Sequence, residues 1–323
     1  MVDIGADDRA RGAVWGQFVG DALCLGSHWH YNLVERDRLY PQGVQGFDAP
    51  VEGHYHAGRK SGEPTHYGDA ALVLLRSLVE RGQLDHIDYG SRFVAEFDRA
   101  DYKGYRDKPT LLTIQAYKDW VAAKAAADFD HQQGADDQQT VTMSRLPPVV
   151  VRHRDDPGLD RVVERAVRVC QNNDRTVFFH QIFARVLARV LNGEPLREAI
   201  ETTIGAAPGE HADEARKFLG DAKATQKLSA IDAAGAFGRS CYLTNTFPCL
   251  LHAALKHGDD PATALIETAR AGGDNASRAA ALGAWVGAAN GVQAIPAEWR
   301  DRLARRKEIG ELTEDLIADM RTG

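Results

Sequence analysis

The chain has 323 residues, of which 44% are hydrophobic and 26% are charged, an ordinary composition for a soluble globular protein with ample material for a buried core. Its 46 Asp and Glu residues outnumber its 39 Lys and Arg residues, which gives a net charge of -7. Because no basic excess is present to neutralise phosphates, we do not expect nucleic acid as a partner. The acidic N-terminus has no apolar run, so we expect neither a signal peptide nor a membrane span and place the protein in the cytoplasm.

The first predicted helix carries glycines at every fourth position, Gly12, Gly16 and Gly20, and it ends near Asp21. Glycine inside a helix costs about 1 kcal/mol relative to alanine, so the spacing indicates that another element approaches this side of the helix closely. The four cysteines of the chain form no Cys-x-x-Cys pair and are expected to be reduced, buried and without a chemical role: Cys24, Cys170, Cys241 and Cys249.

A long segment rich in Gly, His and Pro, from Pro41 to Pro64, is predicted to be a loop that carries function or shapes a pocket. The helix that follows begins near Thr65, ends near Gly82 and has Asp69 in its first turn. Five of the twelve histidines fall within one stretch of 39 residues, from residue 28 to residue 66: His28, His30, His54, His56 and His66.

The middle of the chain also shows helical periodicity. Helices are expected over residues 89–127 with an interruption at 102–109, and then over 161–170, 176–191, 210–228 and 246–256. The best candidate for a strand is the short run Pro148–Val151. The pattern predicts an all-α protein with one compact domain spanning residues 1–323.

Near the C-terminus, a helix over residues 261–270 runs into a Gly272-Gly273 turn, and a second helix follows. That second helix repeats the four-residue glycine spacing at Gly283, Gly287 and Gly291. We expect the two glycine-bearing helices to pack against one another with axes well within 12 Å, since close pairs pack at about 8–10 Å. This packing would bring Asp21 and Asp274 to the margins of one cleft.

Three carboxylates, those of Asp21, Asp69 and Asp274, therefore lie at or near helix ends. Clustered carboxylates with a neighbouring hydroxyl such as that of Ser277 suit Mg²⁺ or Ca²⁺, and a carboxylate pair suits acid/base cleavage of a glycosidic bond. The structural alternative is that these residues are independent helix caps and turn residues. From the residues alone, the two interpretations are evenly matched.

The histidines offer a different hypothesis. The pairs His28-Trp29-His30 and His54-Tyr55-His56 would suit zinc or another borderline metal, because imidazole is a favoured ligand of such ions. No cysteine or carboxylate spacing completes a known zinc pattern, however, and pocket-lining histidines are more common than ligands.

Six segments, in their order along the chain, resemble the ADP-ribosylglycohydrolase family, which includes dinitrogenase-reductase-activating glycohydrolase and the J1 crystallins. They are Gly12–Leu23, Thr65–Ala70, Asn172–Arg175, Phe247–Leu255, Gly272–Asp274 and Ile295–Trp299. The resemblance covers nearly the whole chain and implies the orthogonal multi-helix fold of that family. In the family, two Mg²⁺ ions orient the ADP-ribose of the substrate.

The departures from the family pattern fall on the metal ligands. Tyr67, Gly68 and Ala276 stand at positions where the two family motifs have metal ligands, and His28 stands where the family has a glutamate, seven residues after Asp21. The resemblance therefore leaves Asp69, Asp274 and Ser277 as metal ligands and implies at most one Mg²⁺ ion, because Mg²⁺ demands near-ideal octahedral oxygen coordination.

The resemblance implies a hydrolase that cleaves an N- or O-glycosidic bond of an ADP-ribosyl or other ribose-containing substrate, either a small molecule or an ADP-ribosylated partner. Catalytic roles are expected for Asp69, Asp274, His28 and His66, and substrate-binding roles for Asp21, Trp29, Tyr31, Asn275 and Arg278. Two alternatives stay open: an inactive, crystallin-like binding or structural protein on the same fold, and a metalloenzyme that uses His28, His30, His54 and His56. The sequence does not indicate the substrate, the leaving group or the oligomeric state.

Overall fold

The computed structural model describes residues 4–322, and within them it contains sixteen α-helices and no β-strand. Three short 3₁₀ turns and two isolated β-bridges, Ala135 to Gln171 and Gln139 to Tyr242, complete the regular structure. This confirms the all-α prediction. The helices are α1 (Ala6–Leu23), α2 (Leu33–Leu39), α3 (His66–Arg81), α4 (His86–Asp98), α5 (Lys108–Ala123), α6 (Pro147–His153), α7 (Leu159–Arg168), α8 (Asp174–Leu191), α9 (Leu196–Gly205), α10 (Ala212–Ala224), α11 (Ala230–Phe237), α12 (Leu243–His257), α13 (Pro261–Arg270), α14 (Asn275–Asn290), α15 (Ala297–Arg302) and α16 (Arg306–Thr322).

The centre of the fold is the antiparallel pair α1 and α14, which touch backbone to backbone. A Cβ atom placed on Gly12 would lie 2.0 Å from the carbonyl oxygen of Gly287, and one placed on Gly16 would lie 2.0 Å from that of Gly283. Farther along, Gly20 faces the backbone of Ala279 in the same way. The predicted packing of the two glycine faces is thus confirmed, with an alanine completing the third contact.

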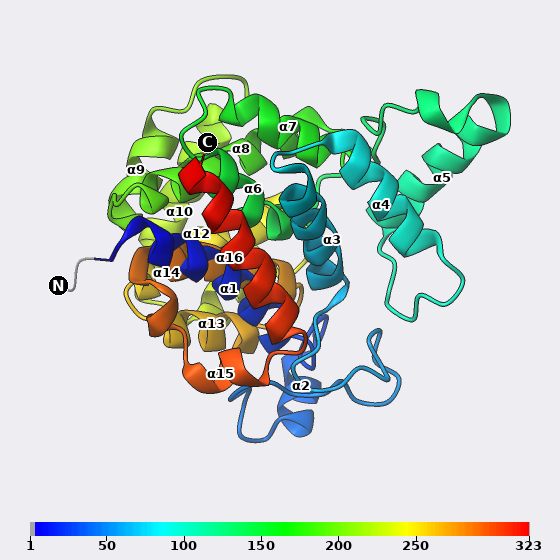
Figure 1. Cartoon of the computed structure of the whole chain (residues 1–323). Coiled ribbons are helices and arrows are strands. Elements are labelled where there is room, and N and C mark those ends of the chain that lie inside the picture. The colour runs from blue at the N-terminus through cyan, green and yellow to red at the C-terminus, as the bar shows by residue number, and fades with distance from the viewer. Residues whose placement is uncertain (1–3, 323) are drawn as a thin grey trace.

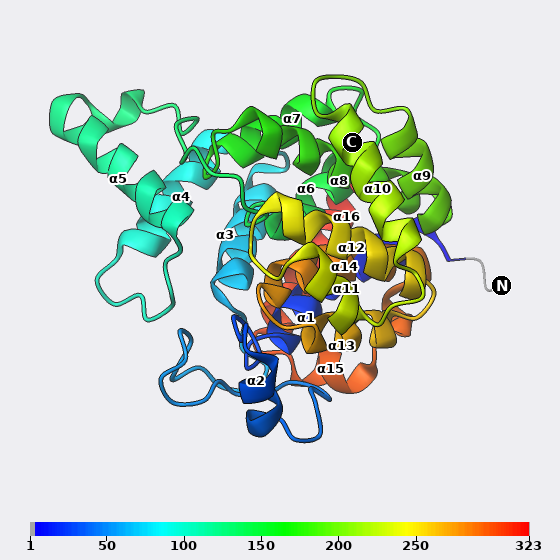
Figure 2. The same cartoon turned by 180° about the vertical axis from the view of Figure 1, so that it is seen from behind.

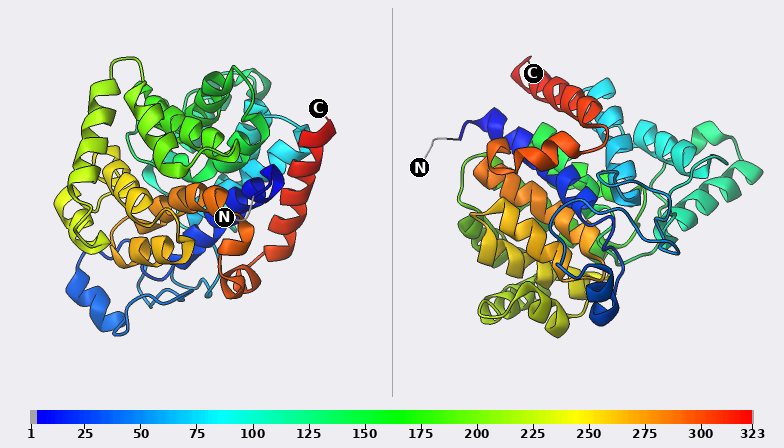
Figure 3. Two further views of the ribbon diagram at one scale, coloured as in Figure 1. Left: turned by 90° about the vertical axis from the view of Figure 1, so that its left-hand side faces the viewer. Right: turned by 90° about the horizontal axis from the view of Figure 1, so that it is seen from below.

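The other helices surround this pair (Figure 1), and α14 is buried on every side from Asn275 to Ala288. Helices α8, α12 and α13 pack against α14, while α16 lies across α1 and α3. Helices α4 and α5 project from this body on one side, as the two opposite views show (Figures 1 and 2). The end-on views place the start of α1 beside the end of α14 (Figure 3).

The best candidate for a strand, Pro148–Val151, is helical instead, since these residues belong to α6. Pro147 and Pro148 occupy the first positions of that helix, where a missing N–H costs nothing, and the first intrahelical bond runs from Val150 N–H to Leu146 O. All three valines are buried, so the run is apolar without alternation. The periodicity of a short, fully buried apolar run does not distinguish a helix from a strand.

The expected helices are present with shifted ends, and six helices of the described chain were not predicted: α2, α6, α9, α11, α15 and α16. The interruption expected near residues 102–109 separates α4 from α5, and Gly291, with φ +80°, ends α14 rather than continuing it. In the part of the chain that is described, no helix has both the length and the apolar character needed to cross a membrane.

Replacing Gly16 with alanine should lower the free energy of unfolding by about 2–3 kcal/mol, because the new methyl group meets backbone atoms of α14 that cannot move aside individually. Gly220, in the interior of α10 with open space around it, is a matched control. Gly220→Ala should raise stability by roughly 0.5–1 kcal/mol. Urea unfolding of both variants measures the difference, and equal effects would contradict the central role of the α1 and α14 contact.

Candidate functional site

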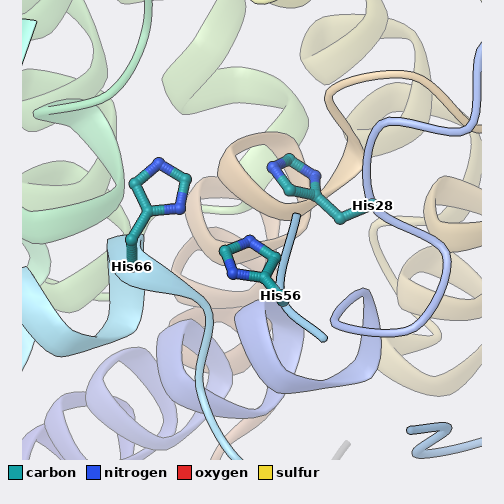
Figure 4. Close-up of side chains that lie close together, drawn as sticks. All are labelled: His28, His56 and His66. Atoms are coloured by element: carbon teal, nitrogen blue, oxygen red, sulfur yellow. The ribbon is translucent and has the colours of Figure 1, made fainter. Parts of the chain in front are cut away.

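Three histidines from three separate segments meet beside the α1 and α14 pair (Figure 4). His28 lies in the loop after α1, His56 lies in the long loop between α2 and α3, and His66 is the first residue of α3. One nitrogen from each ring lies within 4.8 Å of the others, and the exposed fraction of each residue is 2% or less. The long loop between α2 and α3 therefore contributes one of the three histidines.

The orientation of His28 is set by Asn275 at the start of α14. The amide nitrogen of Asn275 donates to the Ser27 hydroxyl and to Ala269 O, each at 2.9 Å, so its oxygen faces His28 Nδ1 at 3.2 Å. The backbone N–H of Ala276 also points at Nδ1, at 3.4 Å, so two groups at the start of α14 hold this nitrogen. Nε2 of His28 is left without a hydrogen-bond partner in a fully buried position.

The ring of His66 faces a carboxylate, whereas the ring of His56 has no hydrogen-bond partner. His66 Nε2 lies 3.2 Å from Oδ2 of Asp107, the N-cap residue of α5. The backbone N–H of His56 donates to Nδ1 of His54, and Nε2 of His54 donates to His28 O at 2.6 Å. His54 is thus satisfied by backbone groups and ties the His56 loop to the His28 loop, whereas neither ring nitrogen of His56 has a partner.

Asp274 reaches the cluster through the turn between α13 and α14. Gly272 and Gly273 both have positive φ, +69° and +65°, and a Cβ on Gly273 would lie 2.2 Å from Arg239 O, so only glycine fits there. Although Asp274 is the N-cap residue of α14, its side chain accepts no capping bond from that helix. Its carboxylate accepts from Ser277 Oγ at 2.8 Å and from the Tyr67 hydroxyl at 3.3 Å, and Oδ1 lies 3.7 Å from His28 Nε2. The conservative interpretation of Asp274 as a simple cap is not what the geometry shows.

The other two candidate carboxylates have structural partners. Asp21 accepts hydrogen bonds from the backbone N–H and the hydroxyl of Thr65, and so anchors the start of α3. Asp69 pairs with the guanidinium of Arg59 and accepts a bond from the Tyr102 hydroxyl at 2.7 Å. It borders a surface hollow of about 400 Å³ that does not include Asp274.

The expected substrate-binding residues include two buried polar side chains, Asn275 and Arg278, and two less buried aromatic ones, Trp29 and Tyr31. Asn275 and Arg278 are buried and hold the backbone, since an Arg278 N–H donates to Gly272 O and Asn275 bridges to Ser27. Trp29 has a positive φ of +60°, and its ring stacks over that of His56 with 5.8 Å between the ring centroids. The backbone N–H of Trp29 donates to Gly273 O. Tyr31 is half exposed, and Ser277 shares a hydrogen bond with Thr140 at 3.1 Å.

Two further aromatic residues join Trp29 to form a roof over the imidazoles. Tyr55 and Tyr105 meet Trp29 edge-on at centroid distances of 5.0 and 4.8 Å, and Tyr105 lies 5.5 Å from His66. Sequence reasoning did not assign a role to either tyrosine, nor to Asp107 or Thr140. Tyr55 stands between two candidate histidines, which was a usable signal, but nothing in the sequence placed residue 105 next to residue 29.

Burial dominates the electrostatics of the site. It lowers the pKa of His28 well below its usual value, helped by the neighbouring His66, and it lowers the pKa of His56 in the same direction. Burial also raises the pKa of Asp274, against the opposing influence of Arg278 and Ser277. For Asp107, burial is outweighed by His66 and Arg145, and the pKa falls to about 2. His28 and His56 are therefore neutral at physiological pH.

The donor set does not fit a pair of Mg²⁺ ions. The oxygens of Asp274, Ser277 and Thr140 already satisfy one another, and Asp69 is engaged by Arg59. The groups left without partners are imidazole nitrogens, which Mg²⁺ does not favour.

Comparisons with known proteins identify the family to which this chain belongs. The chain belongs to the ADP-ribosylglycohydrolase family, whose model matches residues 3–323. It is 29% identical to crystallin J1A and 26% identical to crystallin J1B of Tripedalia cystophora, and each alignment covers 97% or more of both chains. It is 25% identical to the ADP-ribosylarginine hydrolase Tri1 of Pseudomonas putida over 96% of this chain and 78% of that protein.

A solved structure described as an ADP-ribosylglycohydrolase-related protein complex matches 98% of this chain with a TM-score of 0.67 and 22% identity. This likeness confirms the fold expected from the resemblance. The proteins to which the chain is similar thus include both crystallins and a hydrolase.

The buried Asp21 predicts a specific pH dependence of stability. Burial raises its pKa from 3.8 to about 6 despite the bonds from Thr65. Between pH 4 and 6 the native state then holds a proton that the unfolded chain has released, so the free energy of unfolding falls as the pH rises through this window. At 1.36 kcal/mol per pKa unit, the loss is about 3 kcal/mol.

Asp21→Asn removes this titration. The free energy of unfolding of the wild-type protein, relative to that of the variant, should therefore fall by up to about 3 kcal/mol from pH 4 to 6.5. Urea unfolding at several pH values measures this change. Parallel pH curves for the two proteins would show that Asp21 does not titrate in this range.

Proposed function

We propose that the protein hydrolyses an N- or O-glycosidic bond of an ADP-ribosyl or other ribose-containing substrate, with Asp274 as the carboxylate that contacts the ribose. The observation that carries this proposal is the direction of the Asp274 side chain, which faces the imidazole cluster instead of capping its own helix. Membership of the family and the similarity to an ADP-ribosylarginine hydrolase support the same class of reaction.

In this proposal, Tyr67 and Ser277 hold the Asp274 carboxylate, which orients the ribose. His28, whose Nε2 lies 3.7 Å from Asp274 Oδ1, exchanges the proton needed by water or by the leaving group. His66, backed by Asp107, is the second candidate for this proton transfer. Asp21, Asp69, Asn275 and Arg278 act by positioning the surrounding backbone and loops, as their contacts indicate.

The aromatic roof provides a place for a base or a sugar face to stack, on Trp29 and on the more exposed Tyr55, and the half-exposed Tyr31 outside the roof is a further stacking surface. Asp274 itself has no exposed surface under this roof. A ribose can therefore reach Asp274 only when the roof opens, and we propose that the substrate displaces the loop that carries Tyr55.

A crystallin-like protein without catalytic activity is the second candidate function. The specific observations in its favour are the complete burial of Asp274 and His28 and the higher identity to two crystallins than to the hydrolase. Under this alternative, the site stabilises the fold and turns over no ADP-ribosyl compound.

Asp274→Asn should lower the rate of hydrolysis by at least about 100-fold, since groups that act in proton transfer or orientation contribute roughly 10²–10⁴-fold. The assay measures release of free ADP-ribose from ADP-ribosyl-arginine, ADP-ribosyl-serine and O-acyl ADP-ribose, with added Mg²⁺ as a variable. Asp260→Asn is the matched control, because Asp260 caps α13 from an exposed position and asparagine caps equally well. Undiminished activity of the Asp274 variant would refute its role.

Calorimetric titration of ADP-ribose into metal-stripped protein separates the two candidate functions further. Measurable binding together with turnover of at least one compound supports the hydrolase. Absence of both binding and turnover, in a protein that remains folded by circular dichroism, supports the crystallin-like alternative.

A further inference from the structure

We infer that His28, His56 and His66 form a binding site for a divalent transition metal of the zinc type, distinct from the magnesium chemistry expected of the family. The inference goes beyond the proposed hydrolysis and can hold whether or not the protein is an enzyme. Among the described residues, no other group of three His, Cys, Asp or Glu side chains brings its ligand atoms this close together.

The first argument is the number of buried ring nitrogens that lack a hydrogen-bond partner. They are Nε2 of His28, Nδ1 of His66 and both nitrogens of His56, all in side chains with an exposed fraction of 2% or less, whereas Nε2 of His66 faces Asp107. Polar atoms this deeply buried normally have a partner, because leaving one without a partner costs stability. A shared cation provides one partner for all three rings at once.

The second argument is the way two of the rings are held. Asn275 Oδ1 and the Ala276 N–H both contact Nδ1 of His28, which leaves Nε2 to face the cluster. Asp107 lies 3.2 Å from Nε2 of His66, which leaves Nδ1 to face inward. A ligand imidazole whose second nitrogen is held by an amide or a carboxylate is the usual arrangement around a protein-bound zinc ion, and Asn275 and Asp107 provide it here.

The third argument is the position of Asp274. Its Oδ1 lies 3.7 Å from Nε2 of His28, which is too long for a good hydrogen bond, and both side chains are fully buried. A metal ion on the three imidazoles would lie between these groups and would have Asp274 next to its fourth coordination position.

The type of metal follows from the donors. Three neutral imidazoles beside one carboxylate suit Zn²⁺ and its neighbours in the transition series, whereas Mg²⁺ prefers oxygen ligands. An ion here would join the loop after α1, the long loop between α2 and α3, and the start of α3. It would also occupy Nε2 of His28, so His28 could not exchange a proton while the ion is bound.

The test uses the full-length protein, stripped of metal and then titrated with Zn²⁺ against a chromophoric chelator in the presence of excess Mg²⁺. We expect one Zn²⁺ per chain, and we expect His56→Gln to weaken its binding by more than about 100-fold, because substitutions of outer-shell residues alone cost roughly 10–100-fold. His30→Gln is the matched control, since His30 lies two residues from His28 but outside the three-histidine group and should retain full affinity.

X-ray absorption of the zinc-loaded wild-type protein gives a readout that does not depend on the folding of any variant. It should show nitrogen and oxygen ligands at about 2.0–2.1 Å with the outer-shell signal of three imidazoles. Absence of stoichiometric zinc binding would overturn the inference, as would sulfur ligands at about 2.3 Å or loss of zinc in the His30 variant but not in the His56 variant. Zinc binding without glycosidic turnover would support this inference and count against the proposed function.

Discussion

The structure depends on the direct approach of the α1 and α14 backbones. Glycines on both helices remove the side chains that would otherwise separate them, and Gly12 and Gly16 face Gly287 and Gly283 in antiparallel register. Antiparallel packing brings the end of α1 next to the start of α14. The loop that follows one helix therefore meets the turn that precedes the other, and backbone bonds join them from Trp29 to Gly273 and from Gly273 to His30.

This meeting of two chain segments explains why the site is built as it is. Asp274 cannot cap α14 in the ordinary way because the Gly272-Gly273 turn directs its carboxylate toward Tyr67 and His28. Asn275, one residue later, is completely buried and fixes the ring of His28. The start of α14 thus positions two side chains of the site, and α1 determines where their partners lie.

The site of this chain offers imidazole nitrogens where the family resemblance implied oxygen ligands for magnesium. Positions expected to hold such ligands carry Tyr67, Gly68 and Ala276 instead, and His28 stands where the family has a glutamate. Gly68 has a structural reason, since a Cβ there would lie 2.4 Å from a carboxylate oxygen of Asp21. The result is a compact group of imidazoles with one carboxylate, buried beneath three aromatic rings.

Local sequence pattern determined the helical class, most of the long helices and the contact between α1 and α14, because periodicity and glycine spacing are properties of neighbouring residues. It also marked Asp274 and five histidines, four of them in loops and His66 at the start of α3, but it could not say which histidines share a site. Only tertiary structure decided that His66 joins His28 and His56 while His54 bonds to backbone, and that Asp69 turns to Arg59. It also brought Asp107 and Tyr105 into the site. Those pairings join residues tens of positions apart, and their distances follow from how the loops close over the helices rather than from any spacing along the chain.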